Sequence, residues 1–478
     1  MLFNSVDFAI FLPVVFFLYW FVANKNLKVQ NLLILVASYF FYGWWDWRFL
    51  SLIMCSTLVD YFVGLALPGQ TKQSKRKALL LTSIFINIGL LGFFKYYNFF
   101  VDNFISAFSL FGVKLRPGSL NIILPIGISF YTFQTLSYTI DIYRKKFEPT
   151  RDFIAFAAFV SFFPQLVAGP IERATNLLPQ FFTRRKFDYD NGVDGLRQIL
   201  WGLFKKIVIA DNCAIYVDII FSKNSSFSGS TLVLGAFLFA FQIYCDFSGY
   251  SDIAIGTARL FGFKLMRNFA FPYFSRDVAE FWRRWHISLT TWFRDYVYIP
   301  LGGSRGNTHV TVRNIFIIFI VSGFWHGANW TFIVWGALNA FYFLPLLLSN
   351  RNRKNMDTAA CGRFLPSVKD FFNIILTFLL TTLAWIFFRA EDLDHAFSYI
   401  SRIFKMSIFS YPESGSKPLI MLVIFFVLIE WIGRHNEYAI EKFALNWKRP
   451  IRWGFYYILV IIVLFNFGKT QEFIYFQF

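Results

Sequence analysis

The feature that most constrains this sequence is a run of 36 residues, 315–350, that contains no formal charge. A helix needs about 20 apolar residues to cross the ~30 Å hydrocarbon core of a bilayer. The run is therefore too long for one ordinary span, and we predict two membrane segments or a broken helix there. A soluble globular domain rarely contains so long a stretch without charges.

Shorter uncharged or weakly charged runs recur along the whole chain, and only 15% of all residues are charged. Soluble proteins contain about 25% charged residues. The runs are 1–25, 29–45, 78–94, 224–245 and 371–388, with weaker candidates at 48–67, 120–140, 152–170, 418–432 and 452–467. We therefore expect an all-α polytopic membrane protein with about eleven transmembrane helices, forming one integral-membrane domain over residues 1–478. Residues 1–25 lack a basic region and a cleavage site, so we interpret them as a first span rather than a signal peptide.

The net charge of +18 comes largely from basic residues in short loops between the apolar runs. The positive-inside rule and anionic lipid headgroups explain such residues, so we expect membrane lipids and no nucleic acid as partners. Counting Lys and Arg predicts an external N-terminus, an external loop at 44–48 and a cytoplasmic loop at 70–77 of a multi-pass protein in the cytoplasmic (inner) membrane. The four cysteines lack CxxC spacing and suggest neither a zinc site nor a disulfide framework.

Two segments carry too many charges to be simple spans. Residues 195–221 include Lys205, Lys206 and Asp211 among apolar residues, and residues 276–299 carry seven formal charges. Large apolar side chains of the second segment recur every three or four residues and predict one helical face, formed by Trp282, Trp285, Leu289, Trp292 and Tyr296. Such a helix lies in the membrane interface or lines a buried cavity.

Two of the five histidines stand out from their surroundings. His309, His395 and His435 have polar neighbours, and we expect them to face solvent. His326 lies inside the longest uncharged run, and His286 lies in the Trp-rich segment. Polar side chains at membrane depth are costly and are functional by default. An imidazole, with an ordinary pKa near ~6.5, can take a proton from an alcohol near neutral pH.

Structural roles for the same two residues remain open on this basis. His326 could be a core histidine that bonds a neighbouring helix, although the flanking Gly323 and Gly327 favour a close approach or a kink. His286 could pair with a headgroup or a carboxylate at the interface. Neither alternative is excluded by spacing alone.

Several carboxylates lie in or near apolar segments. Any of them could fix a histidine tautomer, but ion pairs with Arg283, Arg284 or Arg294 are the simpler expectation. These carboxylates are Asp60, Glu172 (beside Arg173), Asp246, Asp252 and Asp295. No HExxH, GxSxG, Walker A or GxGxxG motif stands in a suitable context, so we expect no metal site, serine triad or nucleotide cradle.

Ordered motifs along the chain resemble a known family. The central pair is FWRRWHISLTTWFRDYVYIPLGG (281–303) and GFWHGANWTFIVWG (323–336). Further matching stretches are FAIFLPVVFFLYW (8–20), LPIGISFYTFQ (124–134), AGPIER (168–173), YCDFSGYSDIAIG (244–256) and the ending FIYFQF (473–478). This order is similar to that of the membrane-bound O-acyltransferase (MBOAT) family, and most similar to its bacterial, alginate O-acetyltransferase-like branch.

The resemblance implies site residues as well as a fold. It implies a ring of helices around a central cavity, with the family's signature histidine at His326 and a second polar position at His286. Supporting or substrate-binding residues implied around them are Asn329, Asn339, Asp295, Trp325, Trp285 and Arg284. The chain departs from the alginate-type pattern WGAxHG, because its matching stretch WGALNA (335–340) places Asn339 where that pattern has histidine.

The resemblance also implies an activity. An acyl group, most simply acetyl from cytoplasmic acetyl-CoA, would pass to hydroxyls of an extracytoplasmic polysaccharide such as an alginate-like polymer or peptidoglycan. A periplasmic or secreted acetyltransferase of the SGNH type would complete the transfer, and no bound cofactor is implied. The alternative within the family is D-alanyl transfer to teichoic acid from an acyl carrier protein. An alternative of another class is a glycan or lipid transporter without chemistry, although no internal repeat supports it.

Overall fold

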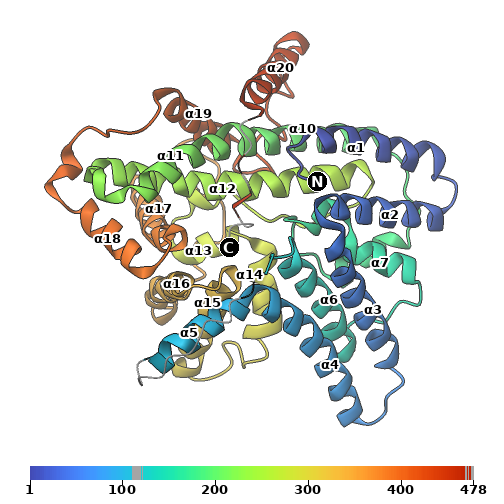
Figure 1. Ribbon diagram of the computed structural model, residues 1–478. Helices are drawn as coiled ribbons and strands as arrows, with labels where there is room; N and C mark the ends of the chain where they lie inside the picture. Colours follow the sequence, from blue (N-terminus) through green and yellow to red (C-terminus); the bar gives the residue numbers. More distant parts are fainter. Residues whose placement is uncertain (110–119, 121, 469–470, 472, 475–478) are drawn as a thin grey trace. The chain divides into compact units, whose positions relative to one another are not determined.

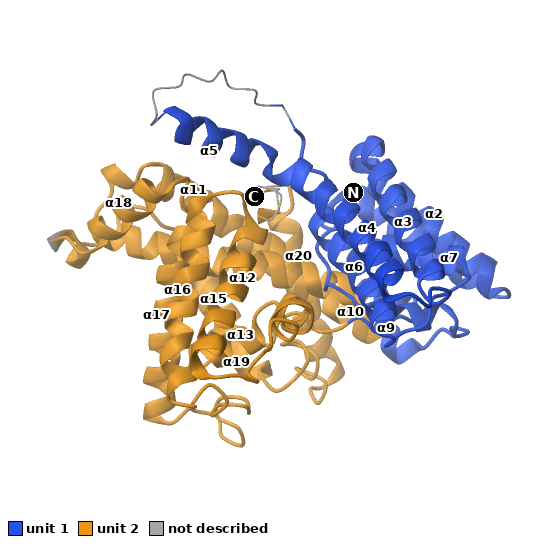
Figure 2. Cartoon of the chain, turned by 90° about the horizontal axis from the view of Figure 1, so that it is seen from below, with its two compact units in different colours: residues 1–192, 257–265 blue, residues 193–256, 266–478 orange. Residues whose placement is uncertain are grey.

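The computed structural model describes residues 1–109, 120, 122–468, 471 and 473–474. Within these residues every regular element is a helix. The chain divides into two compact units (Figure 2). The first comprises residues 1–192 and 257–265, and the second comprises residues 193–256 and 266–478. The all-α fold class predicted from the sequence is confirmed, whereas the expectation of a single domain stays a prediction.

The first unit is a set of apolar helices joined by short connections. Its α-helices are α1 (Val6–Phe17), α2 (Leu27–Asp46), α3 (Leu50–Ala66), α4 (Gln73–Leu91), α5 (Tyr97–Ser109), α6 (Ile128–Tyr143), α7 (Phe153–Ser161), α8 (Phe163–Leu166) and α9 (Ala174–Leu177). Wider π-helical turns extend α1 (η1, Leu18–Val22) and join α4 to α5 (η3, Gly92–Tyr96). Side-chain caps at Ser5 and Asn26 begin α1 and α2, satisfying backbone N–H groups that a helix start leaves free.

The second unit holds the histidine motifs. The boundaries of the unit cut two helices, because α10 begins before residue 193 and α12 ends after residue 256. The helices, labelled in Figure 1, are α10 (Tyr189–Leu203), α11 (Asp211–Ser222), α12 (Gly229–Leu260), α13 (Val278–Arg284), α14 (Ile287–Phe293), α15 (Thr308–His326), α16 (Trp330–Leu348), α17 (Val368–Arg389), α18 (Leu393–Ile403), α19 (Lys417–Gly433) and α20 (Arg449–Asn466). The π-helical turns η5 (Phe204–Ala210) and η8 (Arg294–Tyr298) follow α10 and α14.

Seven helical stretches of the described chain are long and apolar enough to cross a membrane. One of them, Leu27–Ala66, contains both α2 and α3, and shorter apolar helices occur at Val6–Val22 and Phe153–Leu166. The protein is therefore a multi-pass membrane protein. The expected number of about eleven spans stays a prediction, because one apolar stretch can contain two helices.

The long uncharged run forms an antiparallel helical hairpin, as the sequence predicts. Helices α15 and α16 lie side by side and are joined by Gly327, Ala328 and Asn329 (Figure 1). Glycines set their close approach, since a Cβ at Gly323 would lie 2.2 Å from the carbonyl oxygen of Phe332. A Cβ at Gly336 would lie 2.4 Å from the carbonyl oxygen of Phe319. The two backbones therefore touch directly at these positions.

The Trp-rich segment 276–299 is not one helix, which corrects the expectation from its periodicity. It breaks at Trp285 and His286 into α13 and α14, and His286 adopts a left-handed backbone with φ 44°. Four of the five large side chains of its predicted face are nevertheless buried, with Trp285 only 1% exposed, and Tyr296 is half-buried. The segment therefore packs inside the second unit, and its position relative to the membrane interface stays a prediction.

Two weaker span candidates begin or break where glycine and proline impose it. The candidate 120–140 becomes helical only at Ile128, after Gly127 with φ 76°. The candidate 152–170 is split into α7 and α8 at Phe162, just before Pro164. Of the terminal motif FIYFQF, only Phe473 and Ile474 lie within the described residues.

Candidate active site

His326 is the last residue of α15, at the point where the uncharged run breaks. Its side chain is 3% exposed and lies among aromatic rings. The ring centroids of Trp325, Trp335 and Phe388 lie 4.8, 5.2 and 5.3 Å from that of the imidazole. The histidine is thus held in a buried aromatic environment, contributed by α15, α16 and α17.

His286 occupies the break between α13 and α14 and is 1% exposed. Its Nδ1 lies 3.0 Å from Oδ1 of Asn268. Its ring packs edge-to-face on Phe247 at 4.6 Å between centroids. Among the described residues, Nε2 has no hydrogen-bond partner. Burial without a nearby charge lowers the pKa of His286 to about 3, so the imidazole is neutral at physiological pH.

Both histidines contact the same indole. Trp325 has its ring centroid 6.2 Å from that of His286 and 4.8 Å from that of His326. Trp285 belongs to the same aromatic cluster, because it contacts Trp385, which stacks on Trp335. The structure therefore brings together four of the residues predicted for the site: His286, His326, Trp285 and Trp325.

A cavity of about 370 Å³ lies along the α15–α16 hairpin, and Ile287, next to His286, lines it, whereas neither histidine is among its lining residues. Its walls include Phe319 and Ser322 of α15, and Ser322 precedes His326 by one helical turn. At the other end, where α16 leads into the loop 349–367, the lining includes Arg283, Arg294 and Arg353. The cavity is thus mainly apolar, with guanidinium groups gathered toward one end.

The remaining predicted site residues lie around this centre rather than in it. Asn329 caps α16 and donates to the carbonyl oxygen of Glu391 at 2.7 Å. Asn339 donates to the carbonyl oxygen of Trp335 at 2.8 Å, one turn earlier in α16. Arg284 forms an ion pair with Glu280 at 2.8 Å. Asp295 pairs with Arg294 at 2.7 Å, beside the cavity.

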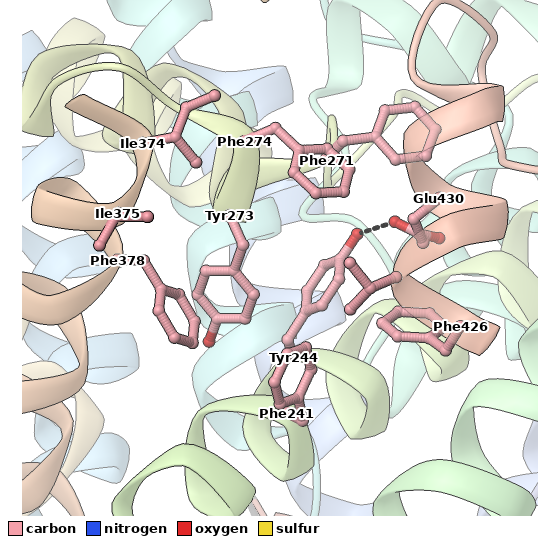
Figure 3. A pocket seen from close by; sticks show the side chains of 11 residues that line it. Phe241, Tyr244, Phe271, Tyr273, Phe274, Ile374, Ile375, Phe378, Phe426 and Glu430 are labelled. Atoms are coloured by element: carbon pink, nitrogen blue, oxygen red, sulfur yellow. Dashed lines mark hydrogen bonds between the residues drawn. The ribbon is translucent and has the colours of Figure 1, made fainter. Parts of the chain in front are cut away.

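A second cavity of about 210 Å³ lies in the same unit, between α12, α17 and α19. Figure 3 shows that aromatic rings surround it, with Tyr273 and Phe378 on one side and Phe426 on the other. Its one carboxylate, Glu430, accepts a hydrogen bond from the Tyr244 hydroxyl at 2.7 Å. Neither histidine lines this cavity either.

Asp246 and Asp252 pair with lysines, which corrects the expectation of arginine partners for them, whereas Asp295 pairs with Arg294 as expected. Lys206 lies 2.7 Å from Asp246 and 2.9 Å from Asp211, and Lys205 lies 2.6 Å from Asp252. The π-helical turn η5 holds both lysines, which are adjacent in sequence yet both buried. These ion pairs tie η5 and α11 to α12.

The carboxylates of the first unit have different partners. Asp60 of α3 is fully buried and accepts hydrogen bonds from Ser83, Asn87 (2.8 Å) and Thr139 (2.9 Å). Glu172 accepts a hydrogen bond from Asn176 at 2.6 Å. Asp60 therefore joins α3, α4 and α6, and no local pattern in the sequence indicates these neutral donors.

Of the three loop histidines, His309 and His435 are exposed, as expected. The expectation is wrong for His395, which is half-buried. Its Nε2 lies 3.1 Å from the carbonyl oxygen of Phe221, and its Nδ1 accepts from the backbone N–H of Glu391 at 3.4 Å. Its polar neighbours in sequence concealed this role, which is to hold the start of α18 against α11.

Comparisons with known proteins agree on one class. A sequence model of the MBOAT, membrane-bound O-acyltransferase family, matches residues 34–387. A probable alginate O-acetylase of Pseudomonas putida is 38% identical, with 99% of each chain covered. A peptidoglycan O-acetyltransferase of Helicobacter pylori is 32% identical, covering 100% of this chain and 98% of the relative. A teichoic acid D-alanyltransferase of Streptococcus thermophilus is 29% identical, covering 67% of this chain and 85% of the relative.

Proposed function

Because the chain belongs to the membrane-bound O-acyltransferase family, we propose that it moves an acetyl group from a cytoplasmic thioester to hydroxyls of an extracytoplasmic polysaccharide. The observation that carries the proposal is the burial of His326 among aromatic rings at the end of α15, where the α15–α16 hairpin turns. Membership of an acyltransferase family favours chemistry over the transporter alternative.

The donor that we propose is acetyl-CoA. Its phosphates match the guanidinium groups of Arg283, Arg294 and Arg353, because guanidinium is well suited to binding phosphate. Its pantetheine arm matches the apolar walls that continue toward Ser322. The loop after α16 carries Arg351, Arg353 and Lys354, and the positive-inside rule assigns such a loop to the cytoplasm, where acetyl-CoA is made.

His326 supplies the base that a thioester substrate requires. In the direct route, its imidazole accepts the hydroxyl proton while the hydroxyl oxygen bonds to the thioester carbonyl carbon. The carbon–sulfur bond then breaks, and the departing thiolate takes the proton back from the imidazolium. In the relay route, an imidazole nitrogen bonds to the thioester carbonyl carbon, the carbon–sulfur bond breaks, and the departing thiolate takes up the imidazole proton. A hydroxyl oxygen then bonds to the acetyl carbon, the carbon–nitrogen bond breaks, and the freed imidazole takes the hydroxyl proton. The surrounding rings exclude the water that would hydrolyse the donor.

His286 is proposed to position the donor or to polarise its carbonyl. Its ring contacts that of Trp325, which also contacts His326, so we place its action in the buried part of the site. Trp325 and Trp285 shape that part. Asn329 and Asn339 fix the first turns of α16 through hydrogen bonds to backbone carbonyl oxygens. Arg284 and Asp295 fix the segment 276–299 through ion pairs.

The acceptor class follows the relatives. Relatives named as alginate O-acetylase and peptidoglycan O-acetyltransferase align over nearly the whole chain, which supports a polysaccharide acceptor. We propose that a periplasmic or secreted SGNH-type protein completes the transfer. D-alanyl transfer from an acyl carrier protein is the second candidate, because a teichoic acid D-alanyltransferase aligns over two thirds of the chain.

The test is acetyl transfer by membranes that contain this chain, measured with acetyl-labelled acetyl-CoA. We expect incorporation into polysaccharide that requires both the chain and a periplasmic extract, and that His326→Ala and His326→Gln both abolish. A general base contributes about 10²–10⁴-fold to a rate. Glutamine keeps much of the size and hydrogen bonding of histidine but is no base, so near-normal transfer by His326→Gln would overturn the assignment. Incorporation from D-alanyl carrier protein alone would select the second candidate.

A further inference from the structure

The tautomer of His286 can be worked out from its neighbours. Asn268 places one side-chain atom near the backbone N–H of Ser288 (3.4 Å) and its hydroxyl (2.9 Å). A backbone N–H can only donate, so this atom is the amide oxygen. The amide nitrogen on the other side donates to the Ser251 hydroxyl at 3.0 Å. Both ends of the Asn268 amide are therefore assigned.

The same oxygen accepts from His286. Because Oδ1 of Asn268 is an acceptor, Nδ1 of His286 at 3.0 Å must carry the proton. The neutral imidazole has only one ring proton, so Nε2 is bare and offers a lone pair. Nε2 is buried and has no donor among the described residues. Nε2 is therefore a buried hydrogen-bond acceptor that no described protein group satisfies.

Asn268 also fixes the backbone that carries His286. The N–H of Ile287 donates to the carbonyl oxygen of Asn268 at 2.8 Å, and the N–H of Ala270 donates to the carbonyl oxygen of Arg284 at 2.9 Å. These bonds flank His286, whose left-handed backbone is costly for a side chain with a Cβ. Residue 268 thus sets both the conformation and the protonation of the histidine.

We propose that Asn268 is a positioning residue that holds His286 as a hydrogen-bond acceptor for an N–H or O–H group of a substrate. The inference rests on the proposed function and separates the two roles given there to His286. A bare Nε2 cannot donate to a thioester carbonyl, so the geometry selects positioning over carbonyl polarisation. Two substrate groups could donate this hydrogen bond: an amide N–H of the pantetheine arm of the acyl donor, and the hydroxyl of the acceptor.

The surroundings of His286 make this state insensitive to pH. The rings packed against it come from Phe247 of α12, Phe269 and Trp325, which do not titrate. Charged groups lie beyond Asn268, where Lys205, Asp252, Arg267, Glu430 and Glu437 line a small cavity with it. A carboxylate in place of the Asn268 amide would be the nearest charge to the imidazole and would favour its protonated form.

Two variants of Asn268 test the proposal through kinetics. Asn268→Leu removes the acceptor oxygen, and we expect transfer to fall about 10–100-fold, as when the hydrogen-bond partner of a functional histidine is removed. Asn268→Asp keeps the oxygen, so activity should survive at high pH. It should then fall, relative to the wild type, as the pH drops below the raised pKa of His286, because Nε2 becomes protonated and can no longer accept. If the activity of Asn268→Asp relative to the wild type did not change with pH, the proposal would be overturned.

A matched control distinguishes positioning from general damage. Asn314 is another fully buried asparagine of the second unit, and it donates to the carbonyl oxygens of Leu301 and Gly303. Asn314→Leu should lower the amount of folded protein without changing the pH dependence of the remaining activity. The source of the substrate's donor group is read from the kinetics of Asn268→Leu: a raised KM for acetyl-CoA indicates the pantetheine amide, and a lowered kcat indicates the acceptor hydroxyl.

A measurement of the His286 tautomer needs no catalysis and therefore tests the role of Asn268 independently of the proposed function. The chain has five histidines, so ¹⁵N-histidine labelling gives few signals, and His286→Gln identifies the signal of His286. We expect a protonated Nδ1 and an unprotonated Nε2 in the wild type, and a mixture of tautomers in Asn268→Leu. A protonated Nε2 in the wild type would overturn the proposal even if acetyl transfer is found. Absence of all acyl transfer would overturn the proposed function and leave this measurement intact.

Discussion

Gly323→Ala should push α15 and α16 apart and thereby displace His326. The added Cβ would lie 2.2 Å from the carbonyl oxygen of Phe332 and 3.4 Å from Cα of Gly336. A carbon atom approaches a carbonyl oxygen to about 3.3 Å. The two helices must therefore separate by about 1 Å, because both contacting groups are backbone and no side chain can rotate away.

This displacement occurs one turn before His326. Overpacking of this kind costs about 1–3 kcal/mol, partly offset by about 1 kcal/mol from the better helix propensity of alanine. Misplacement of a catalytic group by about 1 Å costs about 100-fold in rate. We therefore expect a protein that inserts and folds but transfers acetyl groups about 100-fold more slowly.

The assay compares acetyl transfer per molecule of folded protein with the thermal midpoint in detergent. The matched control is Gly454→Ala in α20, because a Cβ at Gly454 would meet no atom within 4 Å. That variant should keep its activity and gain stability. Wild-type turnover by Gly323→Ala would refute the argument that the backbone contact sets the position of His326.

Four further predictions follow from the structure. With the exposed Cys55 and Cys361 replaced, an impermeant thiol reagent on intact cells should label Asp46→Cys and not Ser74→Cys; the opposite pattern would reverse the topology. His309→Ala and His435→Ala should change stability by no more than about 0.5 kcal/mol. His395→Ala should cost about 1 kcal/mol of stability, because its hydrogen bond to the carbonyl oxygen of Phe221 is lost. All three variants should keep acetyl transfer, and loss of transfer in any of them would contradict their placement outside the site. Arg353→Gln should raise the KM for acetyl-CoA more than it lowers kcat, and an unchanged KM would remove the basic residues of the cavity from donor binding. Lys206→Met should cost about 3–5 kcal/mol, because Asp211 and Asp246 would lose their shared buried cation; normal accumulation of the folded variant would show that this ion pairing is dispensable.

The sequence predicts the features that depend on length and hydrophobicity. The 36-residue uncharged run could only be two segments or a broken helix, and it forms the hairpin of α15 and α16. His326 was singled out as an ionisable group in that run. Because the break falls directly after it, the same feature that made the histidine conspicuous also places it at a helix end.

Features that depend on long-range pairing escaped prediction. Periodicity across 276–299 predicts one helix, but hydrogen bonds to Asn268 and Ala270 impose a left-handed residue at His286 and break it. Asn268 lies in a non-helical segment, and no local pattern in the sequence distinguishes it from a surface asparagine. The partners of Asp246 and Asp252 were missed for the same reason. Lys205 and Lys206 were conspicuous as charges in an apolar segment, but the π-helical turn that buries both has no recognisable sequence signal.

The antiparallel hairpin gives the proposed reaction a direction in space. Each of its helices has 19 residues, which corresponds to about 28 Å at 1.5 Å per residue. The joined end carries His326, and the open end of α16 leads into the loop with Arg353, so the two lie a helix length apart. A donor that enters at the basic end and reacts at the joined end delivers its acetyl group across most of a bilayer by bond exchange alone. The protein then needs no alternation between inward-facing and outward-facing states, since cleavage of the thioester makes the passage one-way.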